Sequence, residues 1–448
     1  MNITKESTKK YSLPTAVTMI VGICIGSGIF FKTDNILYAS GGSVIKGVLV
    51  FALGAISIVF GGLTFGELAK RTGSAGGLIG YAEEFISPRA ACAAGWFQTF
   101  VYYPALLVVV SRVIGIYTCM LFGIENKLST EMAIGLIFCC FSYVYNCIAP
   151  KFGALFQNLS TLVKLIPLVL FAVAGILFGD SKALSASPET VVSSVGWISA
   201  VAPIAFSYDG WIISTSISHE IKNESKNLPR ALVIGPLIVL GVYVSYFIGV
   251  SFFLGPDAII SMGDSHVYAI AESLFGAAGG KIILIFIIIS VMGTVNGIIL
   301  GFIRMPYSLA VRDNMIPFSE SVSKLSKKSN IPLTSAAIAF VFTLIWCFVH
   351  YFVSSRNLME NSDISEVSVA MSYAMYIPLY YKVYRLYKKG EIKSAFFGIV
   401  CPILASVGSC IVLFGALRNP DLIPVTLIFT VPVLLSLIYF SPAQKKKS

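Results

Sequence analysis

The sequence predicts an all-α polytopic membrane protein with twelve transmembrane helices in a single membrane domain over residues 1–448. Of its 448 residues, 56% are hydrophobic and only 12% are charged, and the mean hydropathy is +0.84. Apolar runs of roughly 20 residues, the length that crosses a bilayer core as a helix, recur along nearly the whole chain. The longest polar stretches, residues 179–194 and 313–332, are too short to bury a hydrophobic core of their own.

The apolar runs between loop signals define the twelve predicted helices. Their centres lie near Ile25, Val59, Leu107, Phe138, Leu168, Ala205, Tyr243, Ile289, Phe342, Ala374, Leu404 and Leu434.

The basic residues predict which side of the membrane holds the termini. An even number of crossings puts both termini on one side, and the loops and tails of that side hold 23 of the 32 lysines and arginines. The opposite loops hold seven: Lys32, Lys46, Lys127, Lys182, Lys281, Arg356 and Arg418. Positive residues concentrate on the cytoplasmic side of a membrane, so we expect both termini in the cytoplasm. This asymmetry also accounts for the net charge of +10, so the charge does not indicate a nucleic-acid partner.

Cysteine and histidine positions predict neither a disulfide framework nor a metal site, and we expect no cofactor. Nearly all of the nine cysteines fall inside apolar runs, where cysteine behaves as a small hydrophobic residue. The three histidines, His219, His266 and His350, are far apart in the sequence. Because HExxH, GxSxG and a convergent pair of membrane carboxylates are absent from the sequence, we do not expect an enzyme.

The first predicted helix contains Gly26-Ser27-Gly28 at mid-membrane depth. Small residues also form close helix contacts, but two glycines that are two positions apart do not share a helix face. We therefore expect a local unwinding here.

The sixth helix contains a comparable interruption, residues 206–211, in which Asp209 is a charge at a costly depth. We expect Asp209 first of all to cap the second half of that helix. Breaks in helices one and six predict an inverted repeat of five plus five helices with a binding site between the breaks. A zwitterion suits such a site, because N–H groups would meet its carboxylate and free carbonyls its ammonium.

The fifth helix contains Lys164 about 13 residues from its cytoplasmic end, roughly 20 Å along a helix. A lysine near a helix end can extend to the interface, but this depth favours a functional role. In a sodium-coupled carrier of this architecture, a bound cation could join the unwound first helix to its neighbours. A fixed ammonium can perform that role without sodium.

These strings together resemble the amino acid-polyamine-organocation superfamily, L-amino acid transporter group, and most of all its bacterial serine/threonine and alanine-serine-cysteine exchangers. The resemblance is carried in order by residues 26–30, 61–68 with Gly76-Gly77, 156–167, 206–211, 220–231, and 293–297 with Arg304. It implies the leucine-transporter-like fold, with repeat one at about residues 12–180, repeat two at about 195–390 and extra helices eleven and twelve at about 394–441.

The resemblance also implies roles for individual residues. Amides of Gly26, Ser27 and Gly28 would hold a substrate carboxylate, and carbonyls of Cys24, Phe206 and Asp209 its ammonium, with Ser207 in the same site. Phe206 would be an aromatic gate, Lys164 would replace the second sodium, and Tyr243 would tie that lysine to the first helix.

The implied activity is sodium-independent exchange of small neutral L-amino acids such as alanine, serine, threonine or cysteine. A proton-coupled symporter of the same fold remains open as an alternative, and a channel or membrane sensor is a less favoured one. Animal members pair with a glycoprotein through a cysteine between helices three and four. Because residues 125–130 contain no cysteine, we expect no heavy-chain glycoprotein partner, only the lipid bilayer and small-molecule amino acids. The resemblance thus implies a stand-alone multi-pass protein of the bacterial cytoplasmic (inner) membrane.

Overall fold

The structure, a computed structural model, describes residues 12–26, 28–72, 77–184, 197–211, 221–312, 315–359, 362–418 and 422–440. The described helices of the first half are α1 (Leu13–Cys24), α2 (Gly28–Phe31), α3 (Thr33–Ala39), α4 (Val44–Ala69), α5 (Gly77–Phe85), α6 (Pro88–Phe97), η1 (Gln98–Tyr102), α7 (Tyr103–Phe122), α8 (Leu128–Ile148), α9 (Pro150–Val163), α10 (Leu165–Phe178) and η2 (Ser181–Leu184). Those of the second half are η3 (Trp197–Ala200), α11 (Val201–Ser207), α12 (Glu224–Leu254), α13 (Pro256–Met262), η5 (Gly263–Ser265), α14 (His266–Phe302), α15 (Arg304–Ala310), α16 (Ser319–Val322), α17 (Leu333–Ser355), α18 (Ile364–Lys388), η6 (Phe396–Val400), α19 (Cys401–Arg418) and α20 (Leu422–Tyr439).

Eight helical stretches of the described residues are long and apolar enough to cross a membrane, so the protein is a polytopic membrane protein. They are 44–69, 88–122, 128–148, 150–178, 226–254, 256–310, 333–355 and 396–417. Eight of the predicted centres lie in these stretches. The other four, Ile25, Ala205, Ala374 and Leu434, lie at the end of α1 and in α11, α18 and α20. The total of twelve crossings stays a prediction.

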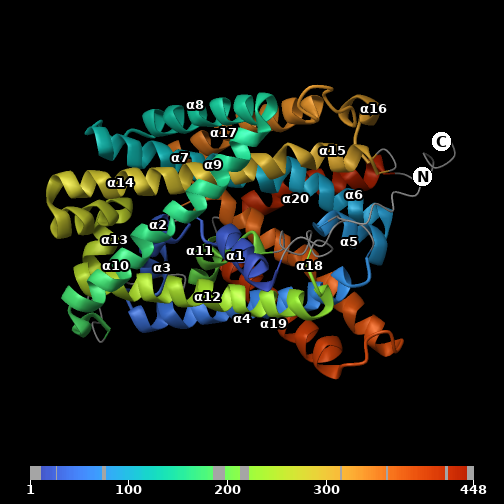
Figure 1. Ribbon diagram of the computed structural model, residues 1–448, viewed down its shortest axis with the longest axis horizontal. Helices are drawn as coiled ribbons and strands as arrows, with labels where there is room; N and C mark the ends of the chain where they lie inside the picture. The colour runs from blue at the N-terminus through green and yellow to red at the C-terminus, as the bar shows by residue number, and fades with distance from the viewer. Residues whose placement is uncertain are drawn as a thin grey trace.

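The helices form two packed groups with short interrupted helices between them. Figure 1 shows α7, α8, α14 and α17 along one side and α4, α12 and α19 along the other, and the helices of each group pack against one another. Between the groups lie α1, α2, α3 and α11, where α11 packs against α4 and α18. The interior of the protein therefore surrounds the two interruptions that the sequence predicts.

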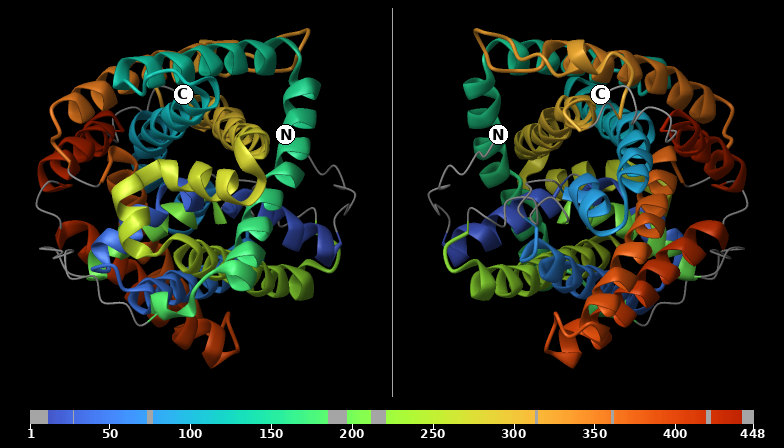
Figure 2. Two further views of the ribbon diagram at one scale, coloured as in Figure 1. Left: turned by 90° about the vertical axis from the view of Figure 1, so that its left-hand side faces the viewer. Right: turned by 90° about the vertical axis from the view of Figure 1, so that its right-hand side faces the viewer.

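The fifth predicted span connects the two groups, as Figures 1 and 2 show. Its first half, α9, packs against α8 and α14, whereas its second half, α10, packs against α12. A Cβ atom at Gly175 of α10 would collide with the backbone of Gly249 of α12, so two glycines permit this close contact. The two halves of the span thus belong to different packing groups.

Candidate functional site

The first interruption lies between α1 and α2. The helix α1 ends at Cys24, and Ile25 has the extended backbone angles φ −71° and ψ 92°. Helical hydrogen bonding therefore stops here, which leaves carbonyl groups near the end of α1 to find other partners. Cys24 and Ile25 are both buried. Ser27, which the sequence analysis assigned to the site, lies outside the described residues.

The second interruption follows α11, which ends at Ser207. A turn over Tyr208 and Asp209 leads to Gly210, whose φ of 94° is a left-handed conformation that glycine adopts without strain. Regular α-helix therefore ends within residues 206–211, where the sequence predicts the interruption. The continuation that Asp209 was expected to cap falls in residues 212–220, which lie outside the described residues.

Tyr243 of α12 connects the two interruptions. Its hydroxyl oxygen lies 2.8 Å from the carbonyl oxygen of Cys24 and 2.8 Å from that of Ser207. A hydroxyl has one hydrogen, so it donates to one of the two carbonyls at a time. Tyr243 is fully buried, which raises the value of this bond, because a carbonyl left unpaired in such a place is costly.

Gly28 and Phe206 bring the two interruptions into direct contact. A Cβ atom at Gly28 would lie 3.1 Å from the ring of Phe206 and 3.1 Å from the Cα atom of Ser207. The absence of a side chain at Gly28 therefore sets how closely α2 approaches α11. Gly26 is different, because a Cβ atom there would meet only ordinary contacts, 3.5 Å or more from Thr294.

Lys164 lies at the joint between α9 and α10. Pro167, the third residue of α10, has no N–H to donate to the preceding turn, and this explains why regular helix is interrupted here. The side chain is buried, and its Nζ atom donates to the carbonyl oxygen of Gly22 at 2.5 Å. The ammonium is thus directed to the unwound end of α1.

Comparison with known proteins shows the family of the chain. The sequence model of a family described as amino acid permease matches residues 11–438, nearly the whole length. The chain belongs to this amino acid permease family.

Three relatives show the range of the permeases that this chain resembles. The serine/threonine exchanger SteT of Bacillus subtilis (strain 168) is 32% identical over 414 residues, which cover 91% of this chain and 91% of SteT. The b(0,+)-type amino acid transporter 1 of Mus musculus is 26% identical over 364 residues, 80% of this chain and 73% of the mouse protein. The cystine/glutamate transporter of Homo sapiens is 25% identical over 414 residues, 89% of this chain and 80% of the human protein. The resemblance stated from the sequence is confirmed.

Asp209 of this permease has a partner that the sequence analysis missed. Its carboxylate accepts a hydrogen bond from the hydroxyl of Tyr102, the last residue of the wide helical turn η1. Such π-type turns often occur at functional sites, and here the turn lies just before Pro104, which has no N–H to donate. Pro104, a proline inside an apolar run, was the feature of the sequence that could have indicated this irregular turn.

Lys32 is a second residue whose place the sequence did not predict. It was counted among the outer loops, yet it is fully buried between α2 and α3. Its ammonium donates to Asp363 at 2.7 Å and to Glu366, both at the start of α18, and lies 5.3 Å from the ring centre of Phe206. An ion-pair cluster thus connects α2, α11 and α18. The partners are more than 300 residues apart in sequence, and no local pattern signals such a contact.

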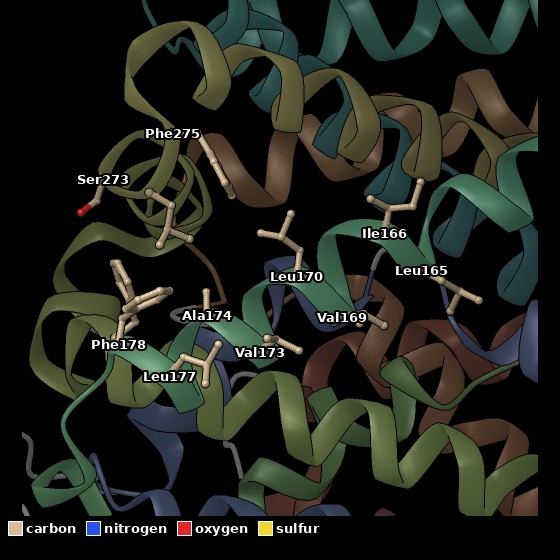
Figure 3. A pocket seen from close by; sticks show the side chains of 12 residues that line it. Leu165, Ile166, Val169, Leu170, Val173, Ala174, Leu177, Phe178, Ser273 and Phe275 are labelled. Atoms are coloured by element: carbon tan, nitrogen blue, oxygen red, sulfur yellow. The ribbon is translucent and has the colours of Figure 1, made fainter.

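An apolar groove of about 1060 Å³ lies away from these residues, along α10 (Figure 3). Its lining is hydrophobic apart from Ser273, and it includes Leu177 and Phe178, which are among the most exposed side chains of α10. Apolar side chains exposed on a membrane helix are what lipid contact requires. We assign the groove to the lipid-facing surface and not to the site.

Among the described residues, no group of three or more His, Cys, Asp and Glu side chains is placed to hold a metal ion. The polar groups around the two interruptions are backbone carbonyls, hydroxyls, the carboxylate of Asp209 and the ammonium groups of Lys164 and Lys32. Such groups bind an organic zwitterion through hydrogen bonds and charge.

Proposed function

We propose that this permease is a sodium-independent exchanger of small neutral L-amino acids, such as alanine, serine, threonine or cysteine, in the bacterial cytoplasmic membrane. The observation that carries the proposal is the bond of 2.5 Å between the Lys164 ammonium and the Gly22 carbonyl, beside the first interruption. A fixed positive charge at an unwound helix end does the work of a bound cation. Coupling to sodium is then not required to hold α1 in place.

The substrate is proposed to bind between the two interruptions. Backbone amides of residues 26–28 would hold its carboxylate, and carbonyls of Cys24, Phe206 and Asp209 its ammonium. The Cys24 carbonyl lies within reach of the Tyr243 hydroxyl, but a carbonyl has two lone pairs and can accept a second bond. Ser207, whose carbonyl also faces Tyr243, belongs to the same wall.

The small size of the substrate is supported by the contact between Gly28 and Phe206. The ring lies against α2 and is 7% exposed, so little room remains beside the first interruption. In this proposal Phe206 moves over the bound amino acid as a gate, while Lys164 and Tyr243 control the position of α1. That one relative is named a serine/threonine exchanger agrees with a small substrate.

The proposed topology has twelve crossings in two inverted repeats, with both termini in the cytoplasm. It rests on the distribution of basic residues and on the match of the predicted centres to described helices.

Uptake by the purified permease in liposomes tests the proposal. Liposomes are loaded with unlabelled serine or left empty, and uptake of labelled alanine, serine, threonine and cysteine is measured in sodium or choline buffer. An exchanger takes up label only into the loaded liposomes, equally well in both buffers. Dependence on external sodium would contradict the proposal, and protein-free liposomes give the background.

A proton-coupled symporter is the competing function, and the same liposomes separate it from exchange. An inward proton gradient should drive accumulation into empty liposomes in a symporter and should leave an exchanger inactive. A protonophore should abolish uptake by the symporter only. Uptake into empty liposomes that follows the gradient would replace exchange by symport.

A further inference from the structure

The segment Gly293–Gly297 of α14, which helped to carry the family resemblance, has no part in the proposed binding site. Its fourth residue, Asn296, is fully buried, and its side chain makes hydrogen bonds to two other helices. A buried amide with complete hydrogen bonding specifies one arrangement of its neighbours, because every alternative leaves polar groups unpaired.

On one side Asn296 is bound by α8. Its Oδ1 atom accepts hydrogen bonds from the Tyr145 hydroxyl at 2.7 Å and from the Asn146 amide at 2.8 Å. On the other side it binds α9, because its Nδ2 atom lies 3.1 Å from the carbonyl oxygen of Gly153 and 3.1 Å from Oε1 of Gln157. One side chain therefore joins α8, α9 and α14.

The glycines of the segment bring α9 against α14. A Cβ atom at Gly293 would collide with the side chain of Ser160, and one at Gly297 would lie 3.2 Å from the Gln157 amide. Gln157, Ser160 and Lys164 follow one another at spacings of three and four residues, so they lie along one side of the helix. The contacts to α14 thus come one and two turns before the lysine.

The neighbouring side of α9 faces α1. A Cβ atom at Gly22 would lie 2.8 Å from Cγ2 of Thr161, and the Gly22 carbonyl accepts the bond from Lys164. The end of α9 therefore lies between α14, which Asn296 fixes, and α1, which ends in the interruption. The position of the end of α9 therefore sets where the base of the Lys164 side chain lies relative to the Gly22 carbonyl.

We propose that Asn296 is the positioning residue for Lys164. It fastens α9 to α8 and α14, so that these three helices form one rigid unit from which the ammonium reaches the Gly22 carbonyl. The inference rests on the proposed role of Lys164 in exchange. Asn296 acts through Lys164 and has no contact with the substrate in this proposal.

The test is a double-mutant cycle read in two ways: the melting temperature of the purified permease, and the rate and KM of serine exchange. The variants are Asn296→Leu and the milder Gln157→Met, each with and without Lys164→Ala. Tyr143→Phe is the matched control, because it removes a buried hydrogen bond of 3.0 Å between α8 and Thr343 that does not involve α9.

We expect Asn296→Leu to slow exchange about tenfold and Gln157→Met about threefold, with KM for serine changed less than twofold. In the Lys164→Ala background the same changes should have no further effect on the rate, since the group they position is absent. The melting temperature of each double variant should fall by less than the sum of the two single losses, because only the part of the loss that acts through Lys164 is shared, and Tyr143→Phe should add its full effect in both backgrounds. Additive losses in rate and melting, or wild-type exchange by folded Gln157→Met and Asn296→Leu, would overturn the proposal.

The two readouts distinguish this inference from the proposed function. If the wild-type permease does not exchange amino acids, the proposed function fails, while the melting temperatures still decide whether Asn296 and Lys164 are coupled. If exchange is present and the two residues are independent, only the positioning role fails.

Discussion

The Nζ atom of Lys164 lies 2.5 Å from the carbonyl oxygen of Gly22, which joins the middle of the fifth predicted span to the end of the interrupted first helix. A buried ammonium is stable only with partners for its charge and its protons. Here one partner is a backbone carbonyl near the end of α1. The bond can therefore exist only while α1 and the joint between α9 and α10 keep their present relation.

Replacement of Tyr243 by phenylalanine removes a single oxygen atom between the two interruptions. We expect Tyr243→Phe to lower the exchange rate about threefold to tenfold, because a buried bond worth about 1 kcal/mol is lost and the Cys24 and Ser207 carbonyls lose a donor. The ring stays, so its contact with Tyr208, at 5.3 Å between centres, is kept.

Tyr246→Phe is the matched control for this prediction. Tyr246 is three residues further along α12 and fully buried, and its hydroxyl has no hydrogen-bond partner among the residues that the structure describes. We expect it to keep the wild-type rate. Equal rates for Tyr243→Phe and the wild type would remove Tyr243 from the coupling of the two interruptions.

Substitutions at Gly28 and Gly26 test two different effects, the packing between the two interruptions and the binding of substrate. In Gly28→Ala the new methyl group would lie 3.1 Å from Phe206 and from the backbone of Ser207, and overpacking of this kind costs about 1–3 kcal/mol. We expect a lower melting temperature and lower transport.

Gly26→Ala meets only ordinary contacts, so the fold should keep its melting temperature. If the amides of residues 26–28 hold the carboxylate, this variant should bind serine more weakly, measured as a higher KM. Unchanged KM in a fully folded Gly26→Ala would place the carboxylate elsewhere.

Phe206→Ala should slow turnover more than it weakens binding. The proposed contacts to the substrate are backbone groups, which the substitution keeps, whereas the ring that would close the site is lost. We expect a reduction in the maximal exchange rate of about tenfold with a smaller change in KM. Phe429→Ala serves as the control, because Phe429 of α20 is also a buried ring and packs against Trp346 of α17, at 4.9 Å between ring centres. A similar loss in both variants would mean that Phe206 is only a packing residue.

The cluster of Lys32 with Asp363 and Glu366 predicts a stability effect that depends on charge balance. Lys32→Met leaves two carboxylates without their cation at a buried place, and breaking a buried ion pair in this way costs about 3–5 kcal/mol. We expect a strongly reduced melting temperature in detergent.

The triple variant Lys32→Met, Asp363→Asn, Glu366→Gln removes the whole cluster and should recover most of that loss, because neutral groups do not need a buried counter-charge. Recovery of stability with altered transport would assign the cluster a role in holding α2 against α18. A triple variant as unstable as Lys32→Met would mean that the packing of the Lys32 side chain, and not its charge, determines the loss of stability.

The sequence predicted those features of the permease that depend only on residues close together in the chain. Two glycines two positions apart weaken regular helix locally at residues 26–28, and an apolar run of about 20 residues is long enough to cross a bilayer as a helix. The depth of Lys164 followed from counting residues. Its partner, the Gly22 carbonyl, is 142 residues away and belongs to the packing of α9 on α1.

The contacts that the sequence could not predict join distant segments. Lys32 was expected in an outer loop because it follows an apolar run, and only its contacts with α18 explain its burial. Asn296 is one of many polar residues in apolar helices, and its importance depends on which groups of α8 and α9 face it. The ends of a helix and the depth of a charged residue in the membrane are local properties of the sequence. The hydrogen-bond and ion-pair partners of a residue depend instead on which helices pack against each other.

Replacement of Lys164 by alanine tests the proposed mechanism most directly. The proposed substrate contacts are main-chain atoms around the two interruptions, so removal of the lysine should leave most of the recognition intact. What it removes is the tie between α1 and the joint of α9 and α10, and an exchanger needs this tie to respond to occupancy of the site. We expect Lys164→Ala to lower exchange of preloaded for external serine at least tenfold, about 1.4 kcal/mol in the controlling barrier, with a smaller change in KM.

Two further variants show whether the charge or the volume of the Lys164 side chain is needed for exchange. Lys164→Met keeps the apolar stem without the ammonium and should be as slow as Lys164→Ala. Lys164→Arg keeps the charge but replaces a compact ammonium by a larger, planar guanidinium, and we expect it to rescue poorly because this group cannot take the place of the buried ammonium beside the Gly22 carbonyl. All rates are measured in choline buffer, in liposomes with and without internal serine. If Lys164→Met exchanges at the wild-type rate, the ammonium does not tie α1 in the working permease, and the case for a mechanism without sodium loses its principal observation.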